Sequence, residues 1–299
     1  MTIVQFITQL EAAGIQLWLD ENHLRYQAPK GALTADLRDQ LLARKPEVIA
    51  FLRQAIQSVA PPMTPLVRDA GTHLPLSFAQ QRVWFQAQLE ANASLFNMPT
   101  VLHLRGRLDA HALSEAFRLL EARHEMLRTT FPEVDGQPYQ QINPPSFALE
   151  VIDLSELPAD QQQAEVARRA DFVVGVPFDV AAGPLWRVSL LRLDPTTHVL
   201  LITVHHIVAD GWSMGIMMSE LSTLYGQLTA QLAPELPALP IQYTDYAHWQ
   251  REWLQGAVLE EHLGYWRQQL TGAPPLLTLP TDFPRPAMQS GRGGHVTFT

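Results

Sequence analysis

The 299-residue sequence contains no cysteine, no long apolar run and no excess of positive charge. Without cysteine there is no disulfide framework, no thiol nucleophile and no cysteine-based zinc site. Because no stretch of 18 or more apolar residues occurs and Met1-Thr2-Ile3 opens without a basic segment, we expect neither a membrane span nor a signal peptide. The net charge of −9 argues against nucleic acid as a partner. The expectation is a globular cytoplasmic protein.

The residues that are present divide the chain into two parts joined by a tether. Residues 1–57 hold six basic and six acidic side chains, so the remainder carries the whole negative balance. A stretch rich in proline and polar residues follows, from Val59-Ala60-Pro61-Pro62 to Asp69-Ala70-Gly71-Thr72, and this composition is typical of an extended linker. We therefore predict one domain at 1–57, a linker at 58–73 and a second domain at 74–299.

Residues 1–57 show the pattern of a helix, two strands and two helices. The apolar spacing predicts helices at 3–13, 34–44 and 46–56, and strands at 15–19 and 24–26 across a turn at Glu21-Asn22. Gly14 ends the first helix, Thr34 is placed to cap the second, and Pro46 lies in the first turn of the third.

The rest of the chain mixes strands and helices, which predicts an α+β layer with a mixed sheet. The expected helices lie at 77–89, 109–123, 159–172, 213–228, 243–254 and 262–270, the fourth with Ser213 as its N-cap. The expected strands lie at 100–104, 127–131, 139–142, 185–193 and 198–204. We expect the last strand to be covered on both faces, because it is almost continuously apolar.

The most informative stretch is His205-His206-Ile207-Val208-Ala209-Asp210-Gly211, where that strand turns into a helix. Neighbouring residues of a strand point to opposite faces, so one histidine is expected to face a site and the other to face structure. An imidazole accepts or donates protons near pH 7. Asp210 is expected to hold the loop by pairing with an arginine or by capping the helix, and Gly211 to allow a sharp turn or a close substrate approach.

These residues resemble the HHxxxDG signature of condensation domains of nonribosomal peptide synthetases. Four further stretches match the family in kind and order: Leu76-Ser77-Phe78-Ala79-Gln80-Gln81-Arg82-Val83-Trp84-Phe85, Arg123-His124-Glu125-Met126-Leu127-Arg128-Thr129-Thr130-Phe131, Phe178-Asp179 with Gly183-Pro184-Leu185, and Tyr243-Thr244-Asp245-Tyr246-Ala247-His248-Trp249. The first of these resembles the subclass that joins an L-configured donor to an L-configured acceptor.

The resemblance implies an enzyme that forms an amide bond between two carrier-bound thioester substrates. Carried over by position, the catalytic set is His206, His205, Asp210 and Gly211. His206 is the catalytic histidine, as base or by positioning, and His205 supports the loop. Asp210 holds the loop through a salt bridge with Arg82. The resemblance implies no metal and no directly bound cofactor, because the substrates are carried on the phosphopantetheine of donor and acceptor peptidyl carrier proteins.

The family's fold resembles chloramphenicol acetyltransferase, with two similar lobes and a tunnel between them. The resemblance over 74–299 covers the N-terminal lobe, and motifs of the second lobe do not occur in the sequence. We therefore expect the C-terminal lobe, and with it half of the tunnel wall, to be absent from the chain.

Residues 1–57 resemble N-terminal docking domains of the tubulysin-synthetase type, on the strength of Leu17-Trp18-Leu19, Leu24-Arg25-Tyr26 and Ala28-Pro29-Lys30-Gly31. Such domains capture the C-terminal tail of an upstream synthetase. An open hairpin edge accepts a third strand by main-chain hydrogen bonds. The predicted docking surface comprises Trp18, His23, Arg25, Tyr26 and Lys30, and a small stabilising cap is the alternative.

Two other classes of function stay open at this point. One is an epimerisation or other acyl-transfer domain of the same superfamily, and the other is a non-catalytic docking fragment. Five aromatic side chains at helical spacing are expected in the core rather than on substrate: Trp84, Phe85, Tyr243, Tyr246 and Trp249. His124 is expected to be structural, and a position facing the channel is the alternative.

Overall fold

The computed structural model describes residues 3–20, 23–29, 31–57, 60–68, 73–89, 93–277 and 279–284. The chain divides into two compact units: a smaller one of Met1–Pro62 with Gly256–Glu261, and a larger one of Met63–Gln255 with His262–Thr299. Within the described residues, no helix combines the length and apolar character needed to cross a bilayer.

The smaller unit has the expected αββαα order: α1 (Ile3–Ala12), β1 (Gln16–Asp20), β2 (His23–Gln27), α2 (Ala35–Ala43) and α3 (Lys45–Gln57). Its core consists of Phe6, Leu10, Ile15, Leu41 and Val48. The expected turn at 21–22 lies outside the described residues.

Two local signals of the smaller unit act as the sequence predicts. Gly14 follows α1 with φ +75°, a backbone conformation that costs glycine nothing, and so lets the chain turn into β1. Thr34 caps α2, because its Oγ1 accepts a hydrogen bond from the backbone N–H of Leu37 at 3.3 Å.

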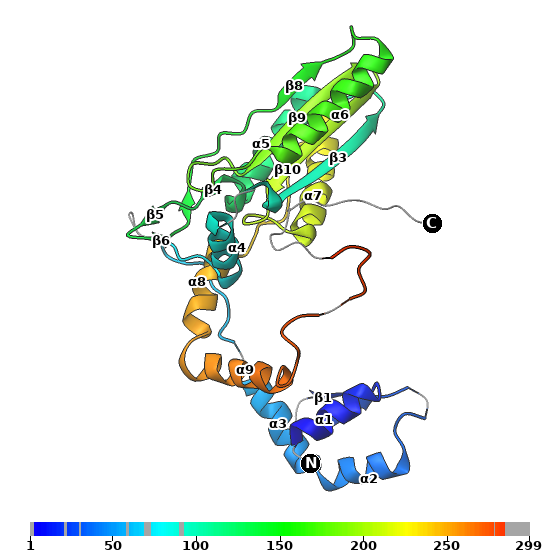
Figure 1. Cartoon of the computed structure of the whole chain (residues 1–299), viewed down its shortest axis with the longest axis vertical. Coiled ribbons are helices and arrows are strands. Elements are labelled where there is room, and N and C mark those ends of the chain that lie inside the picture. Colours follow the sequence, from blue (N-terminus) through cyan, green and yellow to red (C-terminus); the bar gives the residue numbers. More distant parts are fainter. Residues whose placement is uncertain are drawn as a thin grey trace. The chain divides into compact units, whose positions relative to one another are not determined.

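The larger unit is built on a mixed four-stranded sheet with the order β3-β10-β9-β8 (Figure 1). These strands are β3 (Asn97–Arg105), β8 (Glu150–Asp153), β9 (Trp186–Asp194) and β10 (Thr197–His205). β10 is antiparallel to both β3 and β9, whereas β8 pairs with β9 in parallel. The predicted α+β class with a mixed sheet is therefore confirmed.

Helices cover both faces of this sheet. α5 (Ala110–Arg123) and α7 (Gly211–Thr229) pack on one face against alternate strand residues such as Leu200 and Ile202. α6 (Ala159–Gly175) covers the other face, over Val199 and Leu201 (Figure 1). β10 is consequently apolar on both sides, as its continuous apolar run predicts.

The remaining elements of the larger unit are short or lie outside the sheet. The helices are α4 (Phe78–Leu89) and α8 (Tyr243–Trp253), with 3₁₀ turns η1 (Ala93–Phe96) and η2 (Glu125–Arg128). The last helix, α9 (Gly256–Gln269), belongs to this unit from His262 onward. Two small antiparallel pairs join β4 (Thr129–Thr130) to β7 (Gln141–Ile142) and β5 (Glu133–Val134) to β6 (Gln137–Pro138).

The structure corrects two details of the expected strands. The strand predicted at 127–131 is a 3₁₀ turn followed by the two residues of β4. The consecutive residues Met126 and Leu127 are both buried, so this segment lacks the in-and-out alternation of a half-buried strand. β8 is absent from the expected strands, since its four residues gain their pairing only from the distant β9.

Residues 63–68 of the predicted linker contact the larger unit. The Leu66 backbone N–H donates to Asp245 Oδ1 at 3.1 Å. Arg68 forms ion pairs with Glu125 at 2.8 Å and with the buried Asp245 at 3.1 Å. The linker boundaries at 58–73 remain a prediction.

Candidate functional site

The two histidines lie where β10 meets α7. β10 ends at His205 and α7 begins at Gly211, which leaves five residues to turn the chain. Backbone hydrogen bonds fix the start of this turn, because the His205 N–H donates to the Leu185 carbonyl at 2.9 Å and the His206 N–H to the Phe96 carbonyl at 2.8 Å. A rigid sheet end thus positions both imidazoles.

His205 is buried and its imidazole serves the loop. Only 1 % of it is exposed, and its ring lies 5.8 Å from the ring of Phe96 and 6.0 Å from that of Phe178, centroid to centroid. Its Nδ1 accepts a hydrogen bond from the Ile207 N–H at 3.2 Å. Burial, and secondarily the neighbouring His206, lower the pKa of His205 to about 4, so this ring is neutral near pH 7.

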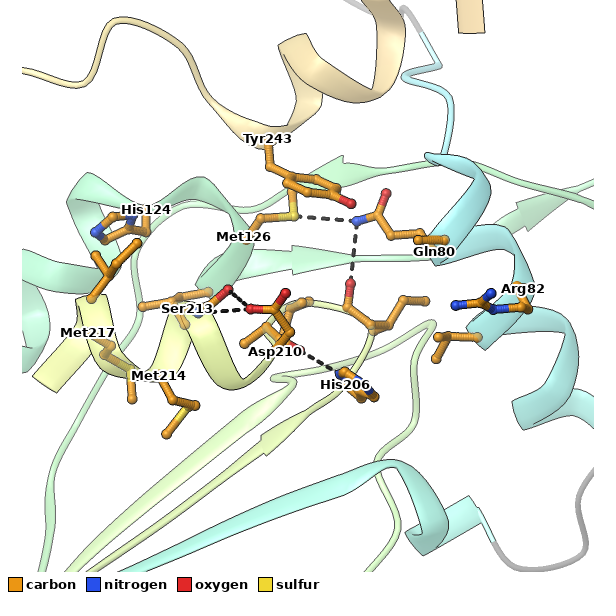
Figure 2. Close-up of a pocket in the computed structure, with 17 residues that line it drawn as sticks. Gln80, Arg82, His124, Met126, His206, Asp210, Ser213, Met214, Met217 and Tyr243 are labelled. Atoms are coloured by element: carbon orange, nitrogen blue, oxygen red, sulfur yellow. Dashed lines mark hydrogen bonds between the residues drawn. The ribbon is translucent and has the colours of Figure 1, made fainter. Parts of the chain in front are cut away.

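His206 is exposed and lines a cavity of about 390 Å³ (Figure 2). Its Nδ1 lies 2.9 Å from the Ala209 carbonyl oxygen. Because a carbonyl only accepts, Nδ1 carries the proton and donates it, which leaves Nε2 of the neutral ring as a proton acceptor. The two histidines divide the roles as the strand geometry predicts: one supports the loop and the other faces a cavity.

Asp210 caps α7. Its Oδ1 accepts hydrogen bonds from the Ser213 backbone N–H at 2.8 Å and from the Ser213 hydroxyl at 2.6 Å. These bonds hold the pKa of the Asp210 carboxyl below its ordinary value. The prediction that Ser213 caps the helix is wrong by three residues, since Ser213 donates to the cap.

The expected salt bridge between Asp210 and Arg82 is not formed among the residues that the structure describes. Arg82 is exposed on α4 and lines the same cavity, apart from Asp210 (Figure 2). Ser213 lies one helical turn away from Asp210 and bonds locally, whereas an arginine on another helix must order a long side chain.

Gly211 is the first residue of α7, and its backbone is not in the left-handed region. A Cβ built there meets no heavy atom within 4 Å. Of the two roles expected for this glycine, the structure supports open space beside the backbone rather than a sharp turn.

The cavity is mainly apolar between its polar groups. Besides His206, Asp210 and Arg82, its lining consists of Ala79, Gln80, Val83, His124, Met126, Leu127, Ile207, Val208, Ala209, Ser213, Met214, Ile216, Met217 and Tyr243. This volume is in the range of small-molecule sites, and a few polar groups on an apolar wall are typical of them. The methionines give the wall adaptable shape.

Gln80 connects the opening motif to the histidine loop, a role that the sequence pattern does not predict. It is 2 % exposed, its Oε1 accepts from the Ser77 N–H at 3.0 Å, and its Nε2 lies 3.4 Å from the Ile207 carbonyl. A buried amide bonded at both ends fixes α4 against the loop. Nothing in the sequence distinguishes it from Gln81.

Tyr243 lines the cavity, whereas the helical spacing predicts a core residue. Its hydroxyl is 3.0 Å from Ser77 Oγ, and burial raises the pKa of this phenol. Its ring also begins a series of aromatic contacts along α8, with Tyr246 at 5.3 Å.

In the smaller unit, the hairpin separates the predicted docking residues onto two faces. Trp18 pairs directly with Arg25, so the two share a face, and Asp20 pairs with His23 in the same register. Tyr26 pairs with Leu17, which packs against the core. Trp18 and Tyr26 are 44 % and 53 % exposed. Lys30 lies outside the described residues.

Comparison with known families agrees with both units. The condensation domain family matches residues 70–299, and the TubC N-terminal docking domain family matches residues 3–54. The chain therefore belongs to the condensation-domain family of nonribosomal peptide synthetases and carries an N-terminal docking domain of the TubC type.

Individual relatives support this membership. A linear gramicidin synthase from Brevibacillus parabrevis is 48% identical over 237 residues, which are 79% of this chain and 5% of that protein. The EpoB cyclization-docking bidomain of the nonribosomal peptide synthetase from Sorangium cellulosum is 26% identical, with a TM-score of 0.67 over 94% of this chain and 55% of that chain.

A third relative is the condensation domain that mediates chain release from the enacyloxin polyketide synthase. It is 28% identical, with a TM-score of 0.62 over 92% of this chain and 53% of that chain. The chain thus spans about half the length of these solved structures and a small part of the gramicidin synthase.

Proposed function

We propose that the larger unit forms an amide bond between two carrier-bound substrates and that the smaller unit captures the C-terminal tail of an upstream synthetase. Both partners of the reaction arrive on the phosphopantetheine arms of donor and acceptor peptidyl carrier proteins. The assembly works in the cytoplasm, and no metal takes part.

The single observation that carries the catalytic proposal is which ring nitrogen of His206 carries the proton. With Nδ1 donating to the Ala209 carbonyl, Nε2 is the acceptor of a ring that lines the cavity. In the proposed step, the acceptor amine attacks the carbonyl carbon of the donor thioester and a C–N bond forms. The C–S bond breaks, and the proton lost by the amine reaches the thiolate by way of Nε2.

Positioning supplies much of the rate in this proposal. A thioester is already activated, so the principal task of the site is to hold the amine and the thioester carbonyl together. His205 and Asp210 serve this task indirectly, since they hold the loop that carries His206. Gly211 leaves room for an arm beside the helix N-terminus.

The first experiment is single-turnover mass spectrometry of dipeptidyl carrier formation with loaded donor and acceptor carriers. It is run with the 299-residue chain and with the chain extended to the length of the solved relatives. We expect His206→Ala to lower the rate at least about 100-fold, the usual contribution of a general base.

The matched control is His103→Ala, which removes an exposed histidine of β3 outside the cavity. This variant is expected to keep the rate of the unchanged protein. Product that survives His206→Ala would reject the histidine mechanism. If active carriers of several side-chain types give no product, the chain acts as a docking fragment or catalyses another acyl transfer.

The docking proposal depends on the hairpin. β1 and β2 form a two-stranded sheet in the described residues, so the tail adds as a third strand through main-chain hydrogen bonds. Trp18 and Arg25 lie on one face and meet the side chains of the tail there. His23 and Lys30 add charge recognition of an acidic tail in this proposal.

Fluorescence titration with peptides copied from C-terminal tails of synthetases tests this docking surface. We expect Trp18→Ala to weaken binding about tenfold, because an aromatic anchor of an interface is worth about 1–2 kcal/mol or more. Leu42→Ala, at an exposed position of α2, serves as the control and keeps the affinity. Equal loss in both variants would contradict the proposed surface.

A further inference from the structure

The cavity has a second imidazole, which the proposed reaction does not use, at the end away from His206. His124 lines this part of the wall and lies apart from His206 (Figure 2). It ends α5, and its backbone is fixed on both sides, since its N–H donates to the Leu120 carbonyl and its carbonyl accepts from the Leu127 N–H. The backbone that carries the imidazole is therefore fixed.

Glu220 orients the His124 ring. His124 Nε2 lies 2.6 Å from Glu220 Oε2, and because a carboxylate accepts, Nε2 donates this bond. Arg123 Nε is 3.2 Å from both oxygens of the same carboxylate, so the charge of Glu220 is already balanced. The Glu220 side chain is 15 % exposed.

The second ring nitrogen of His124 is available to a ligand. Among the residues that the structure describes, His124 Nδ1 has no hydrogen-bond partner. This nitrogen is not one of the fully buried atoms without a partner, so it is accessible. With Nε2 carrying the proton, Nδ1 of the neutral ring is a hydrogen-bond acceptor.

Helix α7 sets the spacing between the two polar ends of the cavity. Ser213, Met214 and Met217 line the cavity along one side of α7, and Glu220 follows one turn later. From Ser213 to Glu220 the helix rises about 10 Å, at about 1.5 Å per residue. The wall between the ends is apolar, formed by Met126, Leu127 and the two methionines of α7.

We infer that His124, oriented by Glu220, is a specificity-determining residue that accepts a hydrogen bond from an N–H or O–H group of the substrate at the end of the cavity away from His206. This inference rests on the function proposed for the same cavity. The donor belongs either to the side chain of the acyl group or to the phosphopantetheine arm. Either source presents a hydrogen-bond donor to Nδ1. The two are distinguished by whether the donor is lost when the side chain or the arm of the substrate is changed.

The test measures binding rather than turnover. The chain is labelled with ¹⁵N-histidine and titrated with stable amide analogues of aminoacyl-pantetheine in three matched pairs: tyrosyl and phenylalanyl, threonyl and valyl, glutaminyl and methionyl. A fourth comparison replaces pantetheine by a short cysteamine arm. We expect the His124 Nδ1 resonance to shift, and the Kd to rise about threefold to tenfold for the member without the donor, the usual worth of one hydrogen bond.

His124→Leu is expected to remove this difference, and His103→Leu, outside the cavity, to keep it. His124→Gln keeps an acceptor and serves if the leucine variant fails to fold. Discrimination within the matched pairs identifies the side chain as the donor, and discrimination only against the short arm identifies the pantetheine.

Equal affinities in every pair and with both arms would overturn the inference, as would discrimination that persists in His124→Leu or the absence of binding by every analogue. Binding of the expected kind without product in the carrier assay would reject the proposed catalysis and leave this inference standing.

Discussion

At the scale of the residue, the adjacent histidines show how one backbone gives two identical side chains different chemistry. His205 belongs to the strand and is sealed between Phe96 and Phe178, whereas His206 is the first residue of the turn and is exposed. Burial lowers the pKa of the His205 ring, since the charged form of a buried imidazole loses its hydration. Hydrogen bonds to Nδ1 have opposite directions in the two rings.

The first prediction concerns acid stability. The pKa of His205 is about 4 in the folded chain and about 6.5 in the unfolded chain, so on acidification the unfolded state binds the proton first. The contribution of neutral, buried His205 to the free energy of unfolding is fully present above about pH 6.5. It is lost as the pH falls toward about 4. At pH 5 the loss is about 2 kcal/mol, from the linkage of 1.36 kcal/mol per pKa unit.

Urea unfolding at pH 7 and pH 5 measures this loss. His205→Gln is expected to lose about 2 kcal/mol less on acidification than the unchanged protein does, whatever the variant's stability at pH 7. His103→Gln, at an exposed position of β3, is expected to retain the original pH dependence. The same pH dependence in all three proteins would show that His205 does not titrate in this way.

At the scale of the element, α7 links the loop that carries His205 and His206 to the core. Its N-terminus is capped by Asp210, its buried residues Met217, Leu221 and Leu224 pack on the face that α5 also covers, and its exposed first turn borders the cavity. The same helix therefore carries Asp210 at one end of the cavity and Glu220 near the other. Its capping decides how rigidly both are held.

The second prediction separates helix capping from the salt bridge expected with Arg82. Asp210→Ala is expected to lower the free energy of unfolding by about 1 kcal/mol, and Asp210→Asn by only a few tenths, because asparagine also caps. Arg82→Ala is expected to change it by less than about 0.5 kcal/mol, as for other exposed side chains.

A double-mutant cycle in urea identifies the partner of Asp210. We expect Asp210→Ala and Ser213→Ala to be non-additive because the side chains bond directly, and Asp210→Ala and Arg82→Ala to be additive. Coupling of Asp210 to Arg82 instead of Ser213 would contradict the capping arrangement.

At the scale of the whole molecule, two units with separate cores lie on one chain. Among the described side chains, five buried residues form the smaller core, whereas the core beside α5 and α7 has many more. A unit of about 60 residues buries a smaller share of its surface and is correspondingly marginal. The two units are therefore expected to unfold independently.

The third prediction tests this independence. Phe6→Ala removes a fully buried ring from the smaller core and is expected to cost about 3–5 kcal/mol, enough to unfold a marginal unit. Hydrogen exchange followed by mass spectrometry should then show loss of protection in peptides of α1 to α3 only. Phe117→Ala, in the larger core, should give the reverse pattern. Loss of protection throughout the chain in Phe6→Ala would show a single cooperative unit.

Local patterns in the sequence are sufficient for most of the elements and for the strand-to-helix corner that holds the two histidines. The apolar run 199–204 predicts a buried strand, Gly14 and Thr34 mark helix ends, and strand alternation gives the two histidines different environments. Each of these depends on neighbours within a few residues, where backbone geometry limits the outcome. The relative roles of His205 and His206 follow from one such limit.

Contacts between distant segments were decided only by the tertiary structure. Gln80 reaches Ile207 from 127 positions away, Glu220 meets His124 across 96, and β8 exists because β9 lies beside it. No periodicity marks such partners, since they are selected by how helices and strands pack. The sequence by itself determined most of the elements and the strand-to-helix corner that holds the two histidines, because these depend on residues close together in the chain. Packing alone decided that Tyr243 and His124 line the cavity of His206, whereas Asp210 bonds locally to Ser213, three residues away, instead of to Arg82.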